Sequence, residues 1–399
     1  MRYGGGFFDL RTLMFHLSAL LQRKKIIILN SDPKLCSEIL ASSDTKGTFL
    51  EQLVATPAWH PIYSIESVDG DLWKQLAGDF SQMMNSLHWR ERLKPIIAKE
   101  TARLSQKEII TSPILSQLVL RVLFNLIFNK EIQTDDETLF YQASLEWRKE
   151  IAVKGKASQE IKEKFWQRLT QIIADSSFKD GLESYKCDPS SWISLFAQPF
   201  LISPQINISD IFVAVFYFID QDKALHSQAL RSAQDGDRKY LEGIILEAIR
   251  LKHPFPILER EIKKDTSFQG KKYFSGTHFF ILLDQFKQDQ NFDPQRWQVV
   301  AGENPYHSIS FAVGPRMCVG KPIAMELMAE LLMTLLKDFP LNNIQLPVGH
   351  YYSGRDNDHK TSLNEAWYQI GVFSKILVKS FFLGRQKKTK EKCPISQIL

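Results

Sequence analysis

A single cysteine in a turn-rich segment is the residue whose surroundings are best suited to chemistry. Cys318 lies in FAVGPRMCVG, residues 311–320. Gly314 and Pro315 form a turn signal, because glycine reaches positive φ and proline fixes φ. From Pro322 onward apolar residues recur at helical spacing, so Cys318 stands just before a predicted helix N-terminus. The free amides and positive dipole end at such a terminus favour an anion, and a thiolate is one.

Three chemical roles for the Cys318 thiolate compete. A nucleophile needs a nearby base, and His307 is the candidate in this part of the sequence. Zinc needs several protein ligands, but no CxxC or HxxxH accompanies Cys318. Haem takes one axial thiolate and needs cations for its propionates, which Arg316 could supply. A buried structural cysteine in a tight turn is a fourth reading, because free cysteine is often buried.

The cysteine segment also resembles a known signature. The pattern Phe311-x-x-Gly314-x-Arg316-x-Cys318-x-Gly320 resembles the haem-binding loop of the cytochrome P450 family, and Ala324 follows as it often does there. The resemblance implies that Cys318 is the axial ligand of the iron of haem b. Phe311, Arg316 and Gly320 are then cofactor-binding residues.

Two upstream segments resemble further motifs of the same family, in the same order along the chain. Glu247-Ala248-Ile249-Arg250 resembles the ExxR helix, and NFDPQRW, residues 291–297, resembles the PERF-type segment. The resemblance implies a structural network of Glu247, Arg250 and Arg296 that locks the core behind the haem. A buried ion pair needs such additional partners to offset its desolvation.

Other positions match family residues that hold the haem propionates. Arg260 follows the ExxR motif at the spacing of an arginine that usually meets a propionate. Trp73, in DGDLWKQLAGDF, matches a tryptophan that clamps a propionate, but Ala77 stands where the accompanying arginine is usual. Lys74 could substitute for that arginine, as a point charge rather than a fork.

The helix expected above the haem departs from the family pattern. The segment ISPQINISDIFVAVFYFIDQDKAL, residues 202–225, contains no (A/G)GxDT motif, whose acid and alcohol relay protons in the family. The alignment places Pro204 to Ile208 over the haem, and Pro204 should break or begin the helix. Asn207 or Ser209 could then hold a water molecule, and an alternative register brings Asp210 or Asp220 nearer the iron. Family members without the acid–alcohol pair include enzymes that rearrange peroxides.

The elements that must position these residues are mostly helical. Segments such as WRERLKPIIAKETARL, PILSQLVLRVLFNLIF and SQEIKEKFWQRLTQIIA have helical periodicity, whereas KKIIIL and GTHFFILL are typical of strands. This mixture agrees with the fold that the resemblance implies, a mainly α (α+β) triangular prism with small sheets at its edge. In that fold the haem lies between a long distal helix and the helix of the cysteine loop. With no linker or repeat, we expect one domain over residues 1–385 and a basic tail over 386–399.

Composition excludes several classes of protein. The net charge of +5 is too small to indicate nucleic-acid binding, and four scattered cysteines favour a reducing compartment. We therefore expect a monomer in the cytoplasm. FFDLRTLMFHLSALL near the start is interrupted by charged residues, so it predicts a core-facing helix rather than a membrane span, although contact with a membrane surface stays open. Basic residues between Arg148 and Lys164 indicate either a solvated helix pair or a face for an acidic partner.

The resemblance implies a haem-thiolate monooxygenase that oxidises an apolar small molecule with O2. Electrons would come from a ferredoxin or a flavoprotein reductase. The missing acid–alcohol pair keeps open a haem-thiolate isomerase, dehydratase or peroxide-using enzyme, and a haem-binding protein without turnover. Apolar residues of the loop 48–63 are candidate substrate contacts, namely Phe49, Leu50, Trp59 and Tyr63.

Overall fold

The computed structural model describes most of the chain. The described residues are 10–42, 45–46, 65, 68–104, 109–151, 155–178, 186, 189–254, 257–283, 286, 289–299, 304, 306–346 and 363–391. The loop residues Phe49, Leu50, Trp59 and Tyr63 lie outside these ranges.

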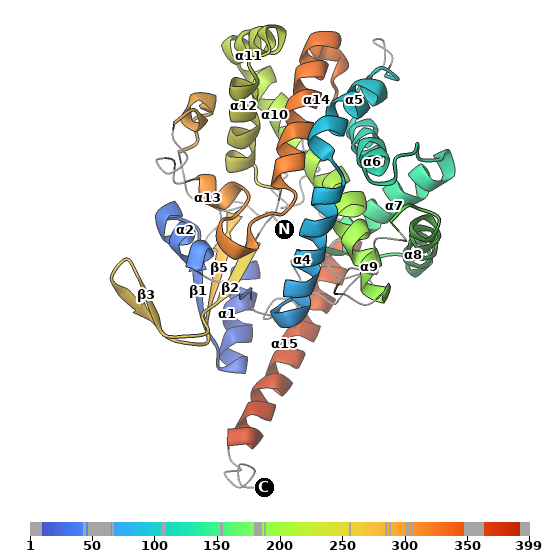
Figure 1. Cartoon of the computed structure of the whole chain (residues 1–399). Helices are drawn as coiled ribbons and strands as arrows, with labels where there is room; N and C mark the ends of the chain where they lie inside the picture. Colours follow the sequence, from blue (N-terminus) through green and yellow to red (C-terminus); the bar gives the residue numbers. More distant parts are fainter. Residues whose placement is uncertain are drawn as a thin grey trace.

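Helices make up most of the described chain (Figure 1). They are α1 (Leu10–Gln22), α2 (Pro33–Ser42), α4 (Gly70–Ser86), α5 (Trp89–Thr101), α6 (Ser112–Phe128), α7 (Thr134–Ile151), α8 (Gln159–Ala174), α9 (Pro189–Phe196), α10 (Ser203–Gln221), α11 (Lys223–Asp235), α12 (Arg238–Leu251), α13 (His307–Ser310), α14 (Lys321–Asp338) and α15 (Leu363–Glu391). The three helices expected from periodicity are α5, α6 and α8. The mainly helical fold class is confirmed.

The strands form two small sheets beside the helical body. They are β1 (Lys25–Leu29), β2 (Ile257–Glu261), β3 (Thr266–Phe268), β4 (Lys271–Tyr273) and β5 (Thr277–Leu282). In the larger sheet, central β5 pairs in parallel with β1 and antiparallel with β2. The smaller sheet is the antiparallel pair β3–β4.

The central strand positions the cysteine loop. All six residues of β5 are buried, in agreement with the apolar run FFIL that follows Thr277 and His278. Because side chains alternate along a strand, Phe280 and Leu282 pack with α1 and α15, whereas Ile281 and its neighbour Leu283 pack with α2 and the start of the cysteine loop. The sheet therefore supports the loop from one side.

A long helical run crosses the middle of the molecule. It consists of α9, a π-helical turn at Ala197–Ile202, and α10. Pro204 has no N–H to donate to the carbonyl of Phe200, and its ring would crowd that carbonyl. The preceding turn widens instead, and the N–H of Ser203 donates to the carbonyl of Gln198, five residues back. Pro204 thus widens the helical run rather than breaking it.

This run also carries the one described helix that is apolar and long enough to cross a membrane, Ile193–Gln221. In its most apolar window 72% of the residues are buried inside the molecule, as in the core helix of a globular protein. α6, α12 and α14 pack with it in the main hydrophobic core.

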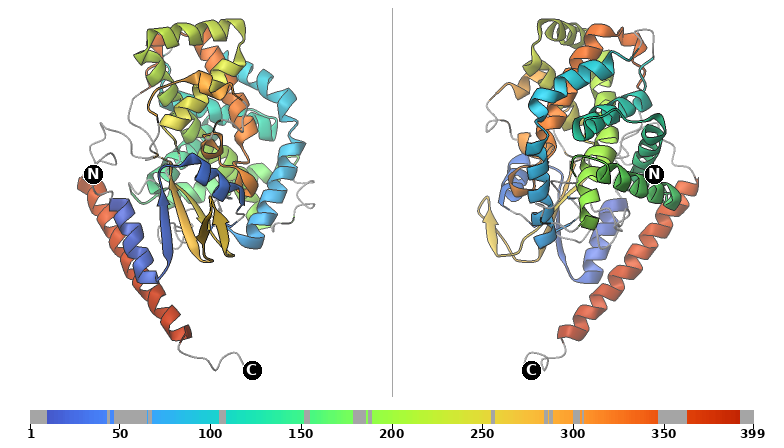
Figure 2. Two further views of the ribbon diagram at one scale, coloured as in Figure 1. Left: turned by 90° about the vertical axis from the view of Figure 1, so that its left-hand side faces the viewer. Right: turned by 45° about the vertical axis from the view of Figure 1, so that its right-hand side comes forward.

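The C-terminal helix crosses the expected domain boundary. α15 continues to Glu391, so the division placed between residues 385 and 386 falls inside a helix. α15 lies beside α1 and extends past it, away from the body of the molecule (Figure 2). The expected first strand–turn–helix unit and the helix beginning near Asp69 are present as β1–α2 and α4.

Candidate functional site

The cysteine loop reaches the start of α14 through a series of tight turns. The N–H of Cys318 donates to the carbonyl of Phe311 at 2.8 Å, and the N–H of Lys321 donates to the carbonyl of Cys318 at 3.2 Å. Gly314 has a φ of +76°, and a Cβ built there would lie 2.6 Å from the carbonyl oxygen of Leu40 in α2. Only glycine combines this backbone conformation with such a close approach. The loop is therefore fixed against α2 with Cys318 just ahead of α14.

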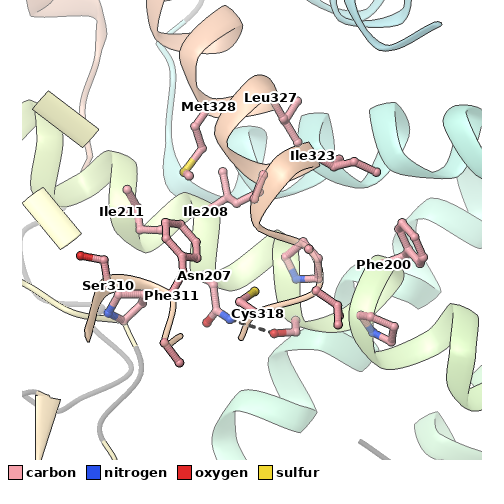
Figure 3. A pocket seen from close by; sticks show the side chains of 18 of the residues that line it. Phe200, Asn207, Ile208, Ile211, Ser310, Phe311, Cys318, Ile323, Leu327 and Met328 are labelled. Carbon is pink, nitrogen blue, oxygen red and sulfur yellow. Dashed lines mark hydrogen bonds between the residues drawn. The ribbon is translucent and has the colours of Figure 1, made fainter. Parts of the chain in front are cut away.

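Cys318 opens onto an apolar cavity between the cysteine loop, α14 and α10 (Figure 3). On the α14 side the wall is formed by Ile323, Ala324, Leu327 and Met328. On the α10 side it is formed by Ser203, Pro204, Asn207, Ile208 and Ile211. These positions recur every three to four residues, so one face of α10 is turned toward the cavity. Phe311, Arg316 and Gly320 line the cavity as well.

The two described cysteines differ sharply in their surroundings. Cys36 is fully buried, and burial together with the negative charge of Asp32 raises the pKa of its thiol to about 12. Cys318 is partly exposed and belongs to the cavity wall. The reading of Cys318 as a buried structural cysteine therefore fits Cys36 instead.

The three candidate catalytic residues of α10, Asn207, Ser209 and Asp210, point in different directions. Asn207 lines the cavity. Ser209 does not; its hydroxyl donates to the carbonyl of Ser112 at 3.1 Å. Asp210 is turned toward α7, where Arg148 donates to its carboxylate at 2.7 Å. The structure therefore gives no support to Ser209 and Asp210 as catalytic residues, because the helical turn that presents Asn207 directs both away from the cavity.

Polar groups in the α10 wall are few. The amide nitrogen of Asn207 donates to the hydroxyl of Ser203 at 2.8 Å, while its buried Oδ1 has no hydrogen-bond partner. Gln198, from the π-helical turn, also lines the cavity. Sequence reasoning missed Ser203 and Gln198, because the widened turn that directs them inward has no simple pattern.

Arg316 makes specific contacts at the edge of the cavity. Its guanidinium donates to the carbonyl of Val68 at 3.1 Å and to the carboxylate of Asp69. The same group lies 4.3 Å from the ring of Trp73, a cation–π arrangement. Trp73 therefore contacts Arg316, which lines the cavity, rather than the cavity itself. Lys74, the other candidate on α4, is exposed to solvent and is not part of this cluster.

Arg260 is buried and only partly satisfied. It is 3% exposed, and one guanidinium nitrogen donates to the carbonyl of Glu259 at 2.7 Å, but Nε has no partner. Burial, and secondly the charge of nearby Arg316, lower its pKa to about 10. Two neighbouring guanidinium groups, one with an unpaired buried donor, form a site that an anion would stabilise.

The expected ionic network is present. Arg250 donates to both oxygens of Glu247, at 2.6 and 2.8 Å, and both side chains are fully buried. Arg296 approaches Glu247 at 3.4 Å and also pairs with Asp289. Trp297 donates its indole N–H to Glu247 at 2.8 Å, a partner that the ExxR motif does not reveal. Each oxygen of Glu247 is therefore satisfied, as a buried carboxylate requires.

The alternatives to haem lose support. His307 does not line the cavity, and its ring packs on Trp297 with centroids 4.9 Å apart. Within the described ranges no group of three or more His, Cys, Asp or Glu side chains could hold a metal ion, whereas zinc is almost always bound by three or four protein ligands. A single thiolate, apolar walls and an unsatisfied buried guanidinium fit haem b, which brings four nitrogen ligands and two carboxylates of its own.

The basic stretch between α7 and α8 is largely paired within the chain. Arg148, Lys149, Lys162 and Lys164 each lie within 4.0 Å of a carboxylate oxygen of this chain. The charges of these four side chains are therefore partly neutralised locally, which weakens the interpretation of the stretch as a face for an acidic partner.

Comparisons with known proteins agree with this geometry. Residues 219–346 match the family model for cytochrome P450. Cytochrome P450 4d2 of Drosophila melanogaster is 35% identical over 29% of the chain, and human cytochrome P450 4V2 is 28% identical over 27%. The matched segments span about a quarter of the length of these relatives, 24% and 22%.

The fold is similar to that of solved structures over most of the chain. A 6-coordinated cytochrome P450 from Thermus thermophilus aligns with a TM-score of 0.59 at 14% identity, covering 82% of this chain and 90% of that one. CYP175A1, from another strain of the same species, aligns with a TM-score of 0.59 at 16% identity, covering 82% and 89%. The motif order, the matched segment and the shared fold agree with one another: the chain is similar to cytochromes P450 in sequence over residues 219–346 and in fold over most of its length.

Proposed function

We propose that this protein is a haem-thiolate monooxygenase that oxidises an apolar small molecule. The observation that carries the proposal is the cavity onto which Cys318 opens, with apolar side chains on both walls and two arginines nearby. When bound, haem b supplies the redox chemistry, with O2 as oxidant and electrons from a ferredoxin or flavoprotein reductase.

The side chains of this chain divide the work of such a site. Cys318 binds the iron, and the dipole of α14 favours its anionic form. Arg260 and Arg316 bind the propionates. The apolar walls exclude water and hold the substrate by burial of its surface. Gly320 keeps the space beside the sulfur open, since a Cβ there would lie 4.0 Å from Sγ of Cys318.

Asn207 and Ser203 are the groups on α10 that can position a water molecule. The unpaired Oδ1 of Asn207 can accept a hydrogen bond from a water molecule. The Ser203 hydroxyl accepts a hydrogen bond from the Asn207 amide and can donate its own proton to the same water. Neither side chain titrates near neutral pH. From the α10 wall, proton delivery therefore depends on this water or on a polar group of the substrate.

Among the described residues, the lack of acidic side chains around the cavity favours a second candidate function. No Asp or Glu side chain lines the cavity in the described part of the chain. This favours, as the alternative, an isomerase, dehydratase or peroxide-using enzyme, whose reaction needs no proton relay to O2.

Turnover assays with the haem-loaded protein separate these functions. We expect a surrogate ferredoxin–reductase pair with NADPH to support oxidation of substrates that perturb the haem spectrum. Turnover with a peroxide substrate alone, and none with NADPH, would establish the second candidate instead. Spectral binding without turnover under either condition would reject both.

The setting of the protein is part of the proposal. The described cysteines, Cys36 and Cys318, form no disulfide, which supports a reducing compartment such as the cytoplasm. We propose that it works there as a monomer with a transient electron-donating partner.

A further inference from the structure

The pair formed by α1 and α15 is joined closely along one side. Ile376 of α15 packs with Met14 and Phe15 of α1 over the sheet. Gln22 donates its amide to the hydroxyl of Ser380 at 3.2 Å. A Cβ at Gly384 would lie 1.9 Å from the carbonyl oxygen of Leu21, so only glycine allows the helices to approach this closely. The pair is therefore a defined structural unit.

A second apolar side of this pair faces solvent. The structure exposes 14 large hydrophobic side chains in its described ranges, and nine of them belong to α1 and α15. On α1 these are Leu13, Leu17 and Leu20, which are 39, 40 and 73% exposed. On α15 they are Leu363, Trp367, Ile370, Val378, Phe381 and Phe382. Isolated exposed apolar residues are normal, but such a concentration on two adjacent helices indicates an interaction surface.

The exposed residues of α15 form their own stripe. At about 100° per residue, Leu363, Trp367, Ile370 and Phe381 fall within roughly 60° of one another around the helix axis. Ile376, which is 1% exposed, points about 140° away from the centre of that stripe, toward α1. α15 is therefore apolar on two separate sides, and its packing in this molecule uses only one.

Positive charge lies within and beside the exposed stripe: by the same helical spacing Arg385 falls within it, whereas Lys375 and Lys379 lie between the stripe and the buried side of α15. Lys375, Lys379 and Arg385 of α15 are exposed, as is Arg23 after α1. The guanidinium of Arg385 lies over the ring of Phe381 at 4.3 Å. From residue 385 the sequence RQKKTKEK contains five basic residues and one acidic residue. Trp, Phe and Leu beside Lys and Arg are typical of helices that lie in a lipid headgroup region.

We propose that the exposed side of α1 and α15 binds the surface of a bilayer containing anionic phospholipids, with α15 lying in the plane of the interface. The apolar stripe enters the headgroup boundary, and the basic residues meet the lipid phosphates and carboxylates. A second copy of the chain fits less well, because a two-fold contact would bring the same cationic residues together.

α15 contacts the bilayer surface without crossing it. It is not among the described helices apolar enough to span a membrane. The proposal is independent of the chemistry at Cys318, so the two can fail separately. It also leaves the protein on the cytoplasmic side, where anionic lipids are concentrated.

Vesicle flotation of the haem-loaded full chain tests this inference. We expect the protein to float with phosphatidylcholine–phosphatidylserine vesicles, and to bind at least roughly tenfold more weakly to phosphatidylcholine alone or in high salt. Trp367→Ser with Phe381→Ser should lower binding roughly tenfold or more. Arg385→Glu, which reverses the charge within the stripe, should lower binding to the anionic vesicles by a similar factor.

The matched control is Phe274→Ser. Phe274 is 57% exposed, as is Phe382, but it lies between β4 and β5. We expect it to bind vesicles like the wild type, with all variants retaining their haem spectrum. Failure of the wild type to float, or an equal loss in Phe274→Ser, would overturn the proposal. A wild-type dimer in sedimentation that becomes a monomer in Trp367→Ser would also overturn it, because the surface would then join two copies of the chain.

Discussion

The two arginines show how the surroundings of a single side chain indicate the charge of its ligand. Arg260 keeps its charge in a buried setting that lowers its pKa to about 10, so at every pH below that value the charged group destabilises the folded apoprotein. We predict that Arg260→Met raises the unfolding temperature of the apoprotein but speeds loss of haem to a haem-scavenging globin by tenfold or more, roughly the worth of one charged hydrogen bond. Equal destabilisation of both forms would mean that Arg260 serves packing alone.

Asn207 and Ser209 lie two residues apart, yet only one borders the cavity. We predict that Asn207→Ala lowers the ratio of product formed to NADPH consumed several-fold, since the water that it positions would lose a partner. Ser209→Ala removes a hydroxyl bonded to Ser112 and should leave that ratio unchanged. Haem content measured beforehand controls for misfolding, and an equal effect of both variants would contradict the assignment.

For the residues of the candidate site, the sequence predicted their chemical roles better than the directions in which their side chains point. Cys318, Arg316, Arg260 and Glu247 could be found because each lies in a motif or at a fixed spacing from one. The directions of Ser209 and Asp210 could not be predicted, because a one-residue change rotates a helical side chain by about 100°. The π-helical turn before Pro204 decides that rotation, and it depends on packing that no local pattern records.

Among the elements, the cysteine loop depends on its contact with α2. Gly314→Ala would place a Cβ 2.6 Å from a carbonyl oxygen of α2 in a backbone conformation that alanine disfavours. Gly270→Ala provides the matched control, because Gly270 has a similar φ of +75° but open space around it. We predict a loss of about 1–2 kcal/mol for Gly270→Ala and a larger loss with reduced haem content for Gly314→Ala. Equal melting temperatures and haem occupancy in the two variants would exclude a special role for the α2 contact.

The α12 helix carries two ion pairs of very different worth. Glu247→Gln removes a charge that balances Arg250 in the core and should cost about 3–5 kcal/mol of unfolding free energy. Glu242→Gln, on the same helix, weakens only a partly exposed pair with Arg238 and should cost about 0–1 kcal/mol. Denaturant unfolding of both variants tests this difference, and similar midpoints would show that the buried network is not structural.

Across the whole molecule, the fold class could be predicted because helical periodicity is strong and the motifs occur in the family's order. The pairing of β1 with β5, about 250 positions apart in the sequence, could not, because register depends on tertiary packing. The end of α15 was also missed. Its basic residues suggested a mobile tail, whereas the apolar residues before them continue one helix to Glu391. The same mixture of apolar and basic residues is the basis of the proposed membrane surface.

The carbon monoxide difference spectrum of the reduced protein tests the central claim, that Cys318 is the axial thiolate of a haem b. The wild type and Cys36→Ala, which alters the other described thiol, should both give the red-shifted band of thiolate-ligated haem. Cys318→Ser should bind less haem and give no such band. A wild type that takes up no haem, or a Cys318→Ser variant that keeps the red-shifted band, would contradict the account.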